Sequence, residues 1–167
     1  MSGMTATIAP ARFPDDVEIV SGLFREYMDG LGIDLAFQAV DAELAGLPGK
    51  YGPPRGTVLL AREGAGHPVG CIALRPLGHP GACEMKRLYV RPEARGQNLG
   101  RRLAEAIIAE ARGRGYSRML LDTLAAMQAA QALYESLGFA ETAAYYENPL
   151  PGTRYLALDL DRDRQAR

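Results

Sequence analysis

The sequence predicts a mixed α/β protein whose twisted sheet carries helices on both faces. Three β-rich segments, residues 57–61, 69–74 and 83–90, are separated by turns that contain Gly and Pro, which is typical of an antiparallel meander. Beyond residue 90 the pattern changes to helix, strand, helix, and this order implies parallel pairing in the second half of the sheet.

The segment before the meander is predicted to contain one strand and two helices. Residues 5–12 form the expected strand, and the proline and two acids at 14–16 are typical of a helix start. Apolar residues then recur at spacings of three and four, and we expect the glycines at positions 30 and 32 to end this helix. Residues 37–47 are expected to form a second, shorter helix.

Beyond the meander, apolar residues at every fourth position predict an amphipathic helix from residue 99 to 111. Residues 119–123 predict a buried strand, and residues 126–137 a further helix that Gly138 ends. A terminal hairpin is expected from residues 143–146 and 155–160.

The length fits one domain covering residues 1–167, since a domain usually has about 100–200 residues. The last residues are charged and lack apolar side chains, so we expect about five of them to be frayed. A net charge of −1, from 19 basic and 20 acidic residues, argues against nucleic acid and anionic membranes as partners. Apolar runs are too short to span a bilayer, and no secretory signal is apparent, so we expect a cytoplasmic protein.

Cysteine and histidine are scarce. Cys71 and Cys83 lie in neighbouring apolar segments, and in a chain without an export signal they are expected to be buried, reduced thiols. His67 and His79 stand beside prolines, and the spacing of these four residues does not match a zinc site. We therefore expect no metal.

The most informative segment runs from Val90 to Arg102 and joins a strand to the amphipathic helix. The first N–H groups of a helix have no intrahelical partners, and with the helix dipole they suit phosphate oxygens. Gly96 and Gly100 allow close approach of a ligand. The alternative is a glycine-containing loop with solvated arginines. The Walker loop and the dinucleotide fingerprint do not fit these residues.

These residues resemble the acetyl-CoA loop of the GCN5-related N-acetyltransferase (GNAT) superfamily, whose pattern is Arg/Gln-x-x-Gly-x-Gly/Ala. Here the loop reads Arg95-Gly96-Gln97-Asn98-Leu99-Gly100, with Asn98 where the family usually has glycine. Asparagine tolerates unusual backbone angles better than most residues and still supplies an N–H. Residues 84–90 and 130–139 are similar to the family's pantetheine-binding strand and to its helix ending in Tyr-x-x-x-Gly-Phe.

The resemblance implies a GNAT-like sheet that is splayed at its centre, with acetyl-CoA as cosubstrate. It assigns the diphosphate to the N–H groups of residues 97–102 and pantetheine to residues 88–90, where an N–H of Leu88 or Tyr89 would polarise the thioester carbonyl. The implied coenzyme-binding residues are Leu88, Tyr89, Val90, Arg95, Gly96, Gln97, Asn98, Leu99, Gly100, Arg101 and Arg102.

Two residues are candidates for catalysis. The resemblance implies Tyr134 as the general acid that protonates the leaving thiolate; the alternative is a tyrosine at the edge of a helix core. Glu84, at the start of the pantetheine strand, is the candidate base for an acceptor ammonium, with a water chain as an alternative. Glu84 could instead be a solvated carboxylate paired with Lys86 or Arg87.

The implied function is direct transfer of an acetyl group to a primary amine of a small molecule or peptide in a ternary complex. Substrate contacts are assigned to a polar and aromatic cluster, which could alternatively serve only packing: Tyr145, Tyr146, Asn148 and Tyr155. Members of the family are often homodimers. Two other functions remain open, a regulatory acyl-CoA-binding module without turnover and a nucleotide-binding protein.

Overall fold

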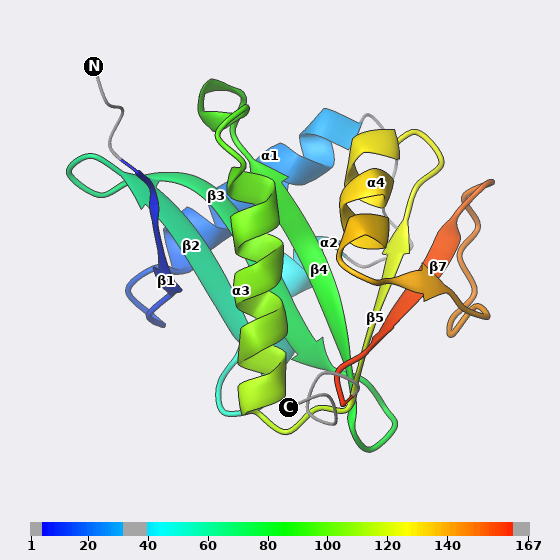
Figure 1. Cartoon of the computed structure of the whole chain (residues 1–167). Coiled ribbons are helices and arrows are strands. Elements are labelled where there is room, and N and C mark those ends of the chain that lie inside the picture. The colour runs from blue at the N-terminus through cyan, green and yellow to red at the C-terminus, as the bar shows by residue number, and fades with distance from the viewer. Residues whose placement is uncertain (1–4, 32–39, 162–167) are drawn as a thin grey trace.

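The computed structural model of the 167-residue chain describes residues 5–31 and 40–161. These residues share one seven-stranded sheet in the order β1-β2-β3-β4-β5-β7-β6, with helices over both faces (Figure 1). The predicted mixed α/β class is confirmed. The strands are β1 (Thr7–Pro10), β2 (Thr57–Glu63), β3 (His67–Pro76), β4 (Ala82–Val90), β5 (Arg118–Thr123), β6 (Ala140–Glu141) and β7 (Arg154–Asp159). The helices are α1 (Val17–Leu31), α2 (Val40–Ala45), α3 (Leu99–Gly113) and α4 (Gln128–Ser136), with short 3-10 helices η2 (Gly49–Tyr51) and η3 (Pro92–Ala94).

The first four strands pair antiparallel in sheet order, so the predicted meander is confirmed. Successive side chains of a strand point to opposite faces of a sheet. In β2, Leu59 and Ala61 join the core layer that contains Leu103 of α3, whereas Val58 and Leu60 join the layer that contains the buried face of α1. Helices on both faces therefore explain why this strand is apolar without alternation.

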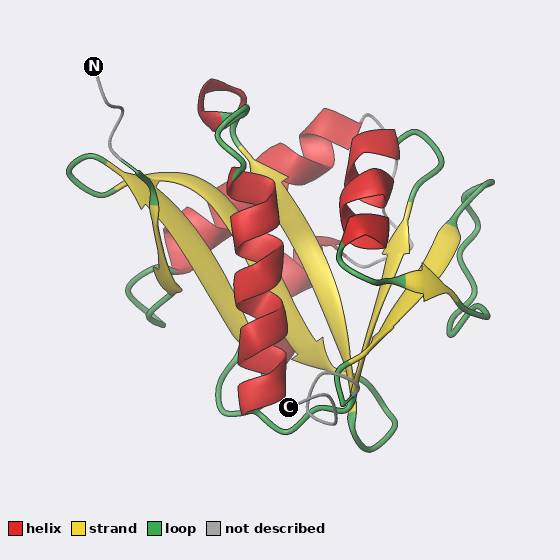
Figure 2. Ribbon diagram, viewed as in Figure 1, coloured by secondary structure: helices red, strands yellow, loops and turns green. Residues whose placement is uncertain are grey.

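The two halves of the sheet meet at β4 and β5, which pair in parallel as the order of elements predicted. Only three residue pairs join them, Ala82 with Arg118, Cys83 with Met119 and Glu84 with Leu120. Beyond Glu84 the two strands diverge, and Figure 2 shows them close at one end and wide apart at the end nearer the N-terminus of α3. The implied splayed sheet is thereby confirmed.

The first helix, α1, ends at Leu31, between the two glycines at positions 30 and 32 that the sequence predicted to end it, so it includes Gly30. Its buried side chains Val20, Leu23 and Phe24 pack on the sheet, and tertiary packing of this kind outweighs the cost of about 1 kcal/mol for one glycine. Of the predicted second helix, residues 37–39 lie outside the described residues, and α2 covers the following part.

The predicted terminal hairpin is wrong in its first strand. β7 pairs with Ala140 and Glu141, whereas residues 143–146 form a loop. The alternation of a strand would place the side chains of Tyr145 and Tyr146 on opposite faces, but both hydroxyls donate to carboxylates of the sheet, to Glu84 and Asp122. These long-range hydrogen bonds explain the loop and cannot be read from local sequence.

The thiols of Cys71 and Cys83 are free and buried, as expected. Cys71 donates to the carbonyl of Arg87 at 3.3 Å, and Cys83 contacts the carbonyl of Arg118 at 3.5 Å. Burial raises the pKa of each thiol from an ordinary value near 9 to about 12. Both side chains therefore act as small apolar groups of the core.

We predict that neither thiol reacts with a thiol-specific reagent in the native protein at about pH 8 and that both react in urea. Because folding raises each pKa, the thiols stabilise the fold fully below about pH 8.5, and this contribution is lost as the pH rises towards 12. A Cys71→Ala, Cys83→Ala variant should lose less unfolding free energy than the parent protein between about pH 9 and pH 11. An equal loss in both proteins would contradict the prediction.

Candidate active site

The loop between β4 and α3 turns twice in left-handed backbone conformations. Gly96 has a φ of +87°, and Asn98, which immediately precedes α3, has a φ of +61°. Asn98 therefore adopts a left-handed backbone conformation, which the sequence analysis expected asparagine to tolerate. Asparagine reaches this region more easily than branched residues, so the loop keeps its shape without a glycine here.

Six consecutive N–H groups of this loop, those of residues 96–101, have no acceptor within the part of the chain that the structure describes. The N–H of Arg102 is engaged, since it donates to the carbonyl of Asn98 at 3.2 Å in the first hydrogen bond of α3. Of the N–H groups at 97–102 that the sequence singled out, those of 97–101 are thus open to a ligand. Open donors at the positive end of a helix fit the oxygens of a phosphate group.

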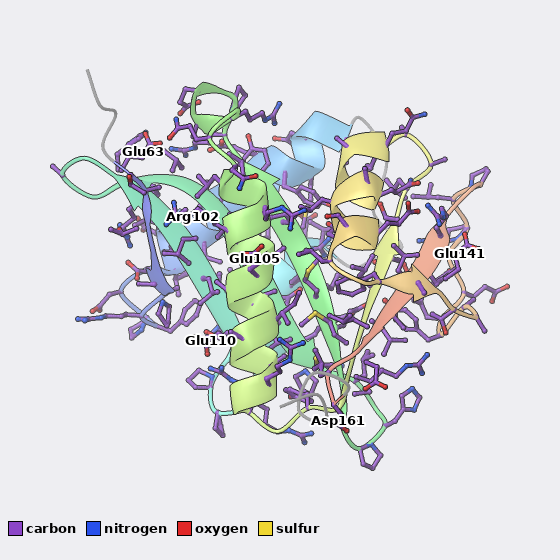
Figure 3. All side chains as sticks on the ribbon, viewed as in Figure 1. Glu63, Arg102, Glu105, Glu110, Glu141 and Asp161 are labelled. Atoms are coloured by element: carbon purple, nitrogen blue, oxygen red, sulfur yellow. The ribbon has the colours of Figure 1, made fainter. Side chains whose placement is uncertain are left out.

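The arginine side chains near the loop are partly engaged. Arg95 Nε donates to the carbonyl of Val90 at 3.0 Å. Arg101 pairs with Glu105 at 3.3 Å and also donates to Ser136 of α4. Arg102 donates to the carbonyl of Ala6 at 2.8 Å, which ties α3 to the segment before β1, and Figure 3 shows it on that flank of the helix. The charges of all three arginines lie near the loop. Arg101 and Arg102 also connect α3 to neighbouring segments.

A bulge in β4 lies beside the point where the sheet opens. The register between β3 and β4 shifts between Cys71 and Ala73, and Arg87 has a φ of +62°. Bulges bend a strand and re-aim its side chains, and they are frequent near active sites. The half-buried residues Leu88, Tyr89 and Val90 follow the bulge and have no strand partner on the β5 side. Backbone groups on that open edge are available to a ligand, as the resemblance implied for pantetheine.

A small cavity of about 40 Å³ occupies the gap between the diverging strands, with room for a few water molecules. It passes from one face of the sheet towards the other, because it is lined by residues of α1 as well as by Met127 and Tyr134 near the two ends of α4. The lining residues are Tyr27, Leu31, Met85, Lys86, Arg87, Asp122, Thr123, Leu124, Met127 and Tyr134.

Tyr134 faces this cavity from α4 and is only 5% exposed. Its backbone belongs to a Schellman motif: the N–H of Phe139 donates to the carbonyl of Tyr134, and the N–H of Gly138, with a φ of +102°, donates to that of Glu135. The rings of Tyr134 and Phe139 pack edge to face at 5.9 Å. The Tyr-x-x-x-Gly-Phe sequence is thus a helix-ending motif that fixes the tyrosine ring.

The hydroxyl of Tyr134 has no hydrogen-bond partner among the described residues, although it lines a cavity beside charged groups. Burial raises the pKa of Tyr134 well above its ordinary value, so the phenol keeps its proton at neutral pH. A protonated hydroxyl without a protein partner can donate to a ligand in the cavity.

Glu84 is fully engaged rather than solvated. Its side chain is 1% exposed, Arg75 Nε donates to it at 2.7 Å, and the Tyr145 hydroxyl donates to its other oxygen. The expected alternative partners, Lys86 and Arg87, form no ion pair with it among the described residues. Glu84 also does not line the cavity, so a proton would have to reach it through another group.

The predicted aromatic cluster is brought together. The rings of Tyr145, Tyr146 and Tyr155 lie edge to face with centroids 5.4–5.6 Å apart. The Tyr155 hydroxyl donates to the carbonyl of Tyr146 at 3.0 Å, and Asn148 Nδ2 donates to the Tyr146 hydroxyl at 2.8 Å. Through the Tyr145 and Tyr146 hydroxyls the cluster bridges Glu84 of β4 and Asp122 of β5, but none of its four residues lines the cavity.

Sequence reasoning did not assign five polar residues of the cavity to the site: Tyr27, Lys86, Arg87, Asp122 and Thr123. Asp122 and Thr123 could have been found, because they are polar residues at the end of an otherwise apolar strand that precedes a loop. Lys86 and Tyr27 carried no such signal.

Comparisons with known proteins agree with this arrangement. The sequence pattern of the Acetyltransferase (GNAT) family matches residues 23–139. An uncharacterized N-acetyltransferase of Schizosaccharomyces pombe is 46% identical over 97% of this chain and 99% of that protein. The solved structure of a GNAT-family acetyltransferase from Staphylococcus aureus shares the fold, with 20% identity, 93% of this chain and 99% of that chain covered, and a TM-score of 0.76. That of yncA from Salmonella typhimurium, which contains acetyl-CoA, has 24% identity, 93% and 94% coverage, and a TM-score of 0.69.

The fold and the site thus define a mixed α/β protein of the acetyltransferase class, built around an opened parallel strand pair. The family match covers most of the chain, and the Schizosaccharomyces pombe relative is similar along nearly its whole length. The chain therefore belongs to the Acetyltransferase (GNAT) family and is an N-acetyltransferase. The resemblance stated from the sequence is confirmed.

Two further findings concern the described residues alone. Within residues 5–31 and 40–161, no three or more His, Cys, Asp or Glu side chains are grouped so that they could hold a metal ion. No helix in these ranges combines the length and apolar character that a membrane crossing requires.

We predict that Asn98→Val lowers the free energy of unfolding by about 1–2 kcal/mol, because a branched residue is strained at a φ of +61°. Asn98→Gly should be neutral or slightly stabilising for the same reason. Urea unfolding monitored by circular dichroism measures both changes. Gln97→Val is the matched control, since the neighbouring residue is exposed and has no positive φ. Equal destabilisation by both valine substitutions would argue against backbone strain.

Proposed function

We propose that this N-acetyltransferase moves an acetyl group from acetyl-CoA to a primary amine of a small molecule or peptide, by direct attack in a ternary complex. The observation that carries the proposal is the Tyr134 hydroxyl, which is protonated and without a partner among the described residues and belongs to a side chain that lines the cavity where β4 and β5 separate. A donor at this point suits the departure of a thiolate.

The coenzyme-binding residues fit the chemistry of coenzyme A. The N–H groups of residues 97–101 bind diphosphate oxygens, with the charge of Arg95 nearby, and residues 88–90 offer backbone groups to the amides of pantetheine. The thioester supplies the acetyl group. An N–H of Leu88 or Tyr89 donates to the carbonyl oxygen of the acetyl group, where negative charge develops during attack.

Protons move at two places. An alkyl ammonium has a pKa near about 10, so the acceptor must lose a proton before its lone pair forms the C–N bond. Glu84 receives that proton through the Tyr145 hydroxyl, which already donates to it, or through water. As the C–S bond breaks, Tyr134 donates its proton to sulfur and later recovers one from solvent.

The remaining expectations are part of the same proposal. The chain acts as one domain over residues 1–167, in the cytoplasm, without a metal or nucleic acid, and as a homodimer as is common in the family. Tyr145, Tyr146, Asn148 and Tyr155 shape the acceptor side, since their cluster joins the two carboxylates that flank the opening. The competing function is a regulatory acyl-CoA-binding module, for which Tyr134 would have no chemical task.

Ligand binding and turnover test the function directly. Acetyl-CoA at about 100 times its Kd should stabilise the protein by about 2.7 kcal/mol in a thermal-unfolding experiment, whereas ATP should give no such shift. A thiol-release assay with a panel of amines should then report turnover. Stabilisation by ATP alone would favour a nucleotide-binding protein, and coenzyme binding without thiol release for any amine would favour the regulatory module.

For the acid role, we predict that Tyr134→Phe lowers kcat by about 100-fold while the Kd for acetyl-CoA stays within about twofold, because only the proton donor is removed. Steady-state kinetics and calorimetric titration measure the two quantities. The matched control is Tyr116→Phe, which removes a buried hydroxyl that donates to Arg55 beyond the other end of α3 and should leave kcat unchanged. An unaltered kcat for Tyr134→Phe would remove this residue from the acid role.

A further inference from the structure

Lys86 is a buried cation without a counter-ion. Its side chain lines the cavity, the residue is 9% exposed, and it has no ion pair or hydrogen bond among the residues that the structure describes. Burial lowers the pKa of Lys86, and the carboxylates of Glu84 and Asp122 oppose this shift through space, although neither lies within ion-pair distance of it. The chain contains only one other lysine, Lys50, which is exposed.

The neighbouring cations differ from Lys86 because each is paired with a carboxylate. Arg75 lies 2.7 Å from Glu84, and Arg87 lies 3.1 Å from Glu43. Glu43 is further bound by the hydroxyl of Tyr51 at 2.9 Å, so both carboxylates are committed. Glu84 therefore acts on Lys86 only at a distance, because the direct contacts of both carboxylates are made by the arginines, and a buried charge without a direct partner is costly.

A second side chain of the cavity also lacks a partner. The Oγ1 atom of Thr123, on β5, is buried and has no hydrogen-bond partner among the described residues, and the residue is 3% exposed. Unsatisfied buried polar atoms are rare in folded proteins, and a ligand atom is one way in which they are satisfied. Lys86 and Thr123 therefore independently indicate that the cavity receives a polar ligand group.

The cavity also contains a carboxylate, that of Asp122. It accepts a hydrogen bond from the Tyr146 hydroxyl, and it forms no ion pair within residues 5–31 and 40–161. Lys86 and Asp122 thus present opposite charges around one small space without neutralising each other by direct contact. A ligand that carries both an ammonium and a carboxylate complements this pair of charges.

We propose that the acetyl acceptor is an amine that also carries a carboxylate, such as a free amino acid, and that Lys86 binds the carboxylate. This proposal rests on the proposed acetyltransferase function and names its substrate class. In this proposal Lys86 contacts the acceptor and determines its specificity for a carboxylate. The carboxylate of the acceptor is then the direct counter-ion of Lys86. Asp122 attracts the ammonium end of the same molecule before it is deprotonated.

The test compares acceptors that differ only in charge. Free L-amino acids and their carboxamides are assayed for acetyl-CoA-dependent thiol release with the full chain. For the best acceptor we expect kcat/KM at least about 10-fold above that of its carboxamide, because only the carboxylate pairs with Lys86. If carboxamides or simple alkyl amines are acetylated equally well, the inference is overturned while the acetyltransferase function stands. If no amine is acetylated, the function itself fails.

Substitution of Lys86 supplies the second measurement. Lys86→Met keeps the length of the side chain and should raise KM for the amino acid by about 10-fold or more, with little change for its carboxamide. Lys86→Arg should retain part of the preference, and Lys50→Met, the same change at an exposed site, should have no effect. The thermal shift with acetyl-CoA should stay unchanged in all three variants.

The Tm of Lys86→Met distinguishes a role of Lys86 in substrate binding from a role in stabilising the fold. Removing an unpaired buried charge should leave the Tm of Lys86→Met equal to that of the parent protein or raise it. A lower Tm together with an unchanged preference for the carboxylate would assign Lys86 to the fold and overturn the inference. A fall in kcat that is equal for amino acid and carboxamide would also overturn it, since this points to proton transfer rather than recognition.

Discussion

The separation of β4 from β5 after three residue pairs is the constraint on which the site depends. Backbone N–H and carbonyl groups of a buried strand need partners, and β4 loses those on its β5 side where it turns away. The bulge at Arg87 bends the strand at this place, and the thiol of Cys71 donates to the Arg87 carbonyl within the bulge. The opening is thereby built into the fold, and the tyrosine of α4 and the loop before α3 lie around it.

Local signals made much of this structure predictable. The meander, α3 and the end of α4 follow from turn residues, apolar periodicity and a glycine with positive φ, all of which act over a few residues. The loop of open N–H groups was predictable for the same reason, because a strand, two glycines and a helix start stand in one short segment. The geometry of this loop is therefore predictable from the sequence.

The surroundings of the cavity between β4 and β5 were not predictable from the sequence, since they depend on contacts between distant segments. Whether Lys86 is free is decided by which carboxylates Arg75 and Arg87 engage, and Glu43 lies 44 residues from Arg87. For Glu84 the sequence offered a general base or, as the alternative, a solvated strand-end carboxylate, and it gave no sign that the Tyr145 hydroxyl 61 residues away completes the burial of this side chain. The same long-range hydrogen bonds displaced the predicted first strand of the hairpin. Charge partners and loop paths of this kind are fixed only when the sheet assembles.

The divided surroundings of β4 have a consequence for how the protein can vary. Residues 82–84 lie between two strands and serve the integrity of the sheet, whereas residues 88–90 have a strand on one side only and leave their other edge without a strand partner. Two successive stretches of β4 thus differ in the number of strands with which they pair. A substitution at residues 82–84 therefore affects the pairing with two strands, whereas one at residues 88–90 affects the pairing with a single strand.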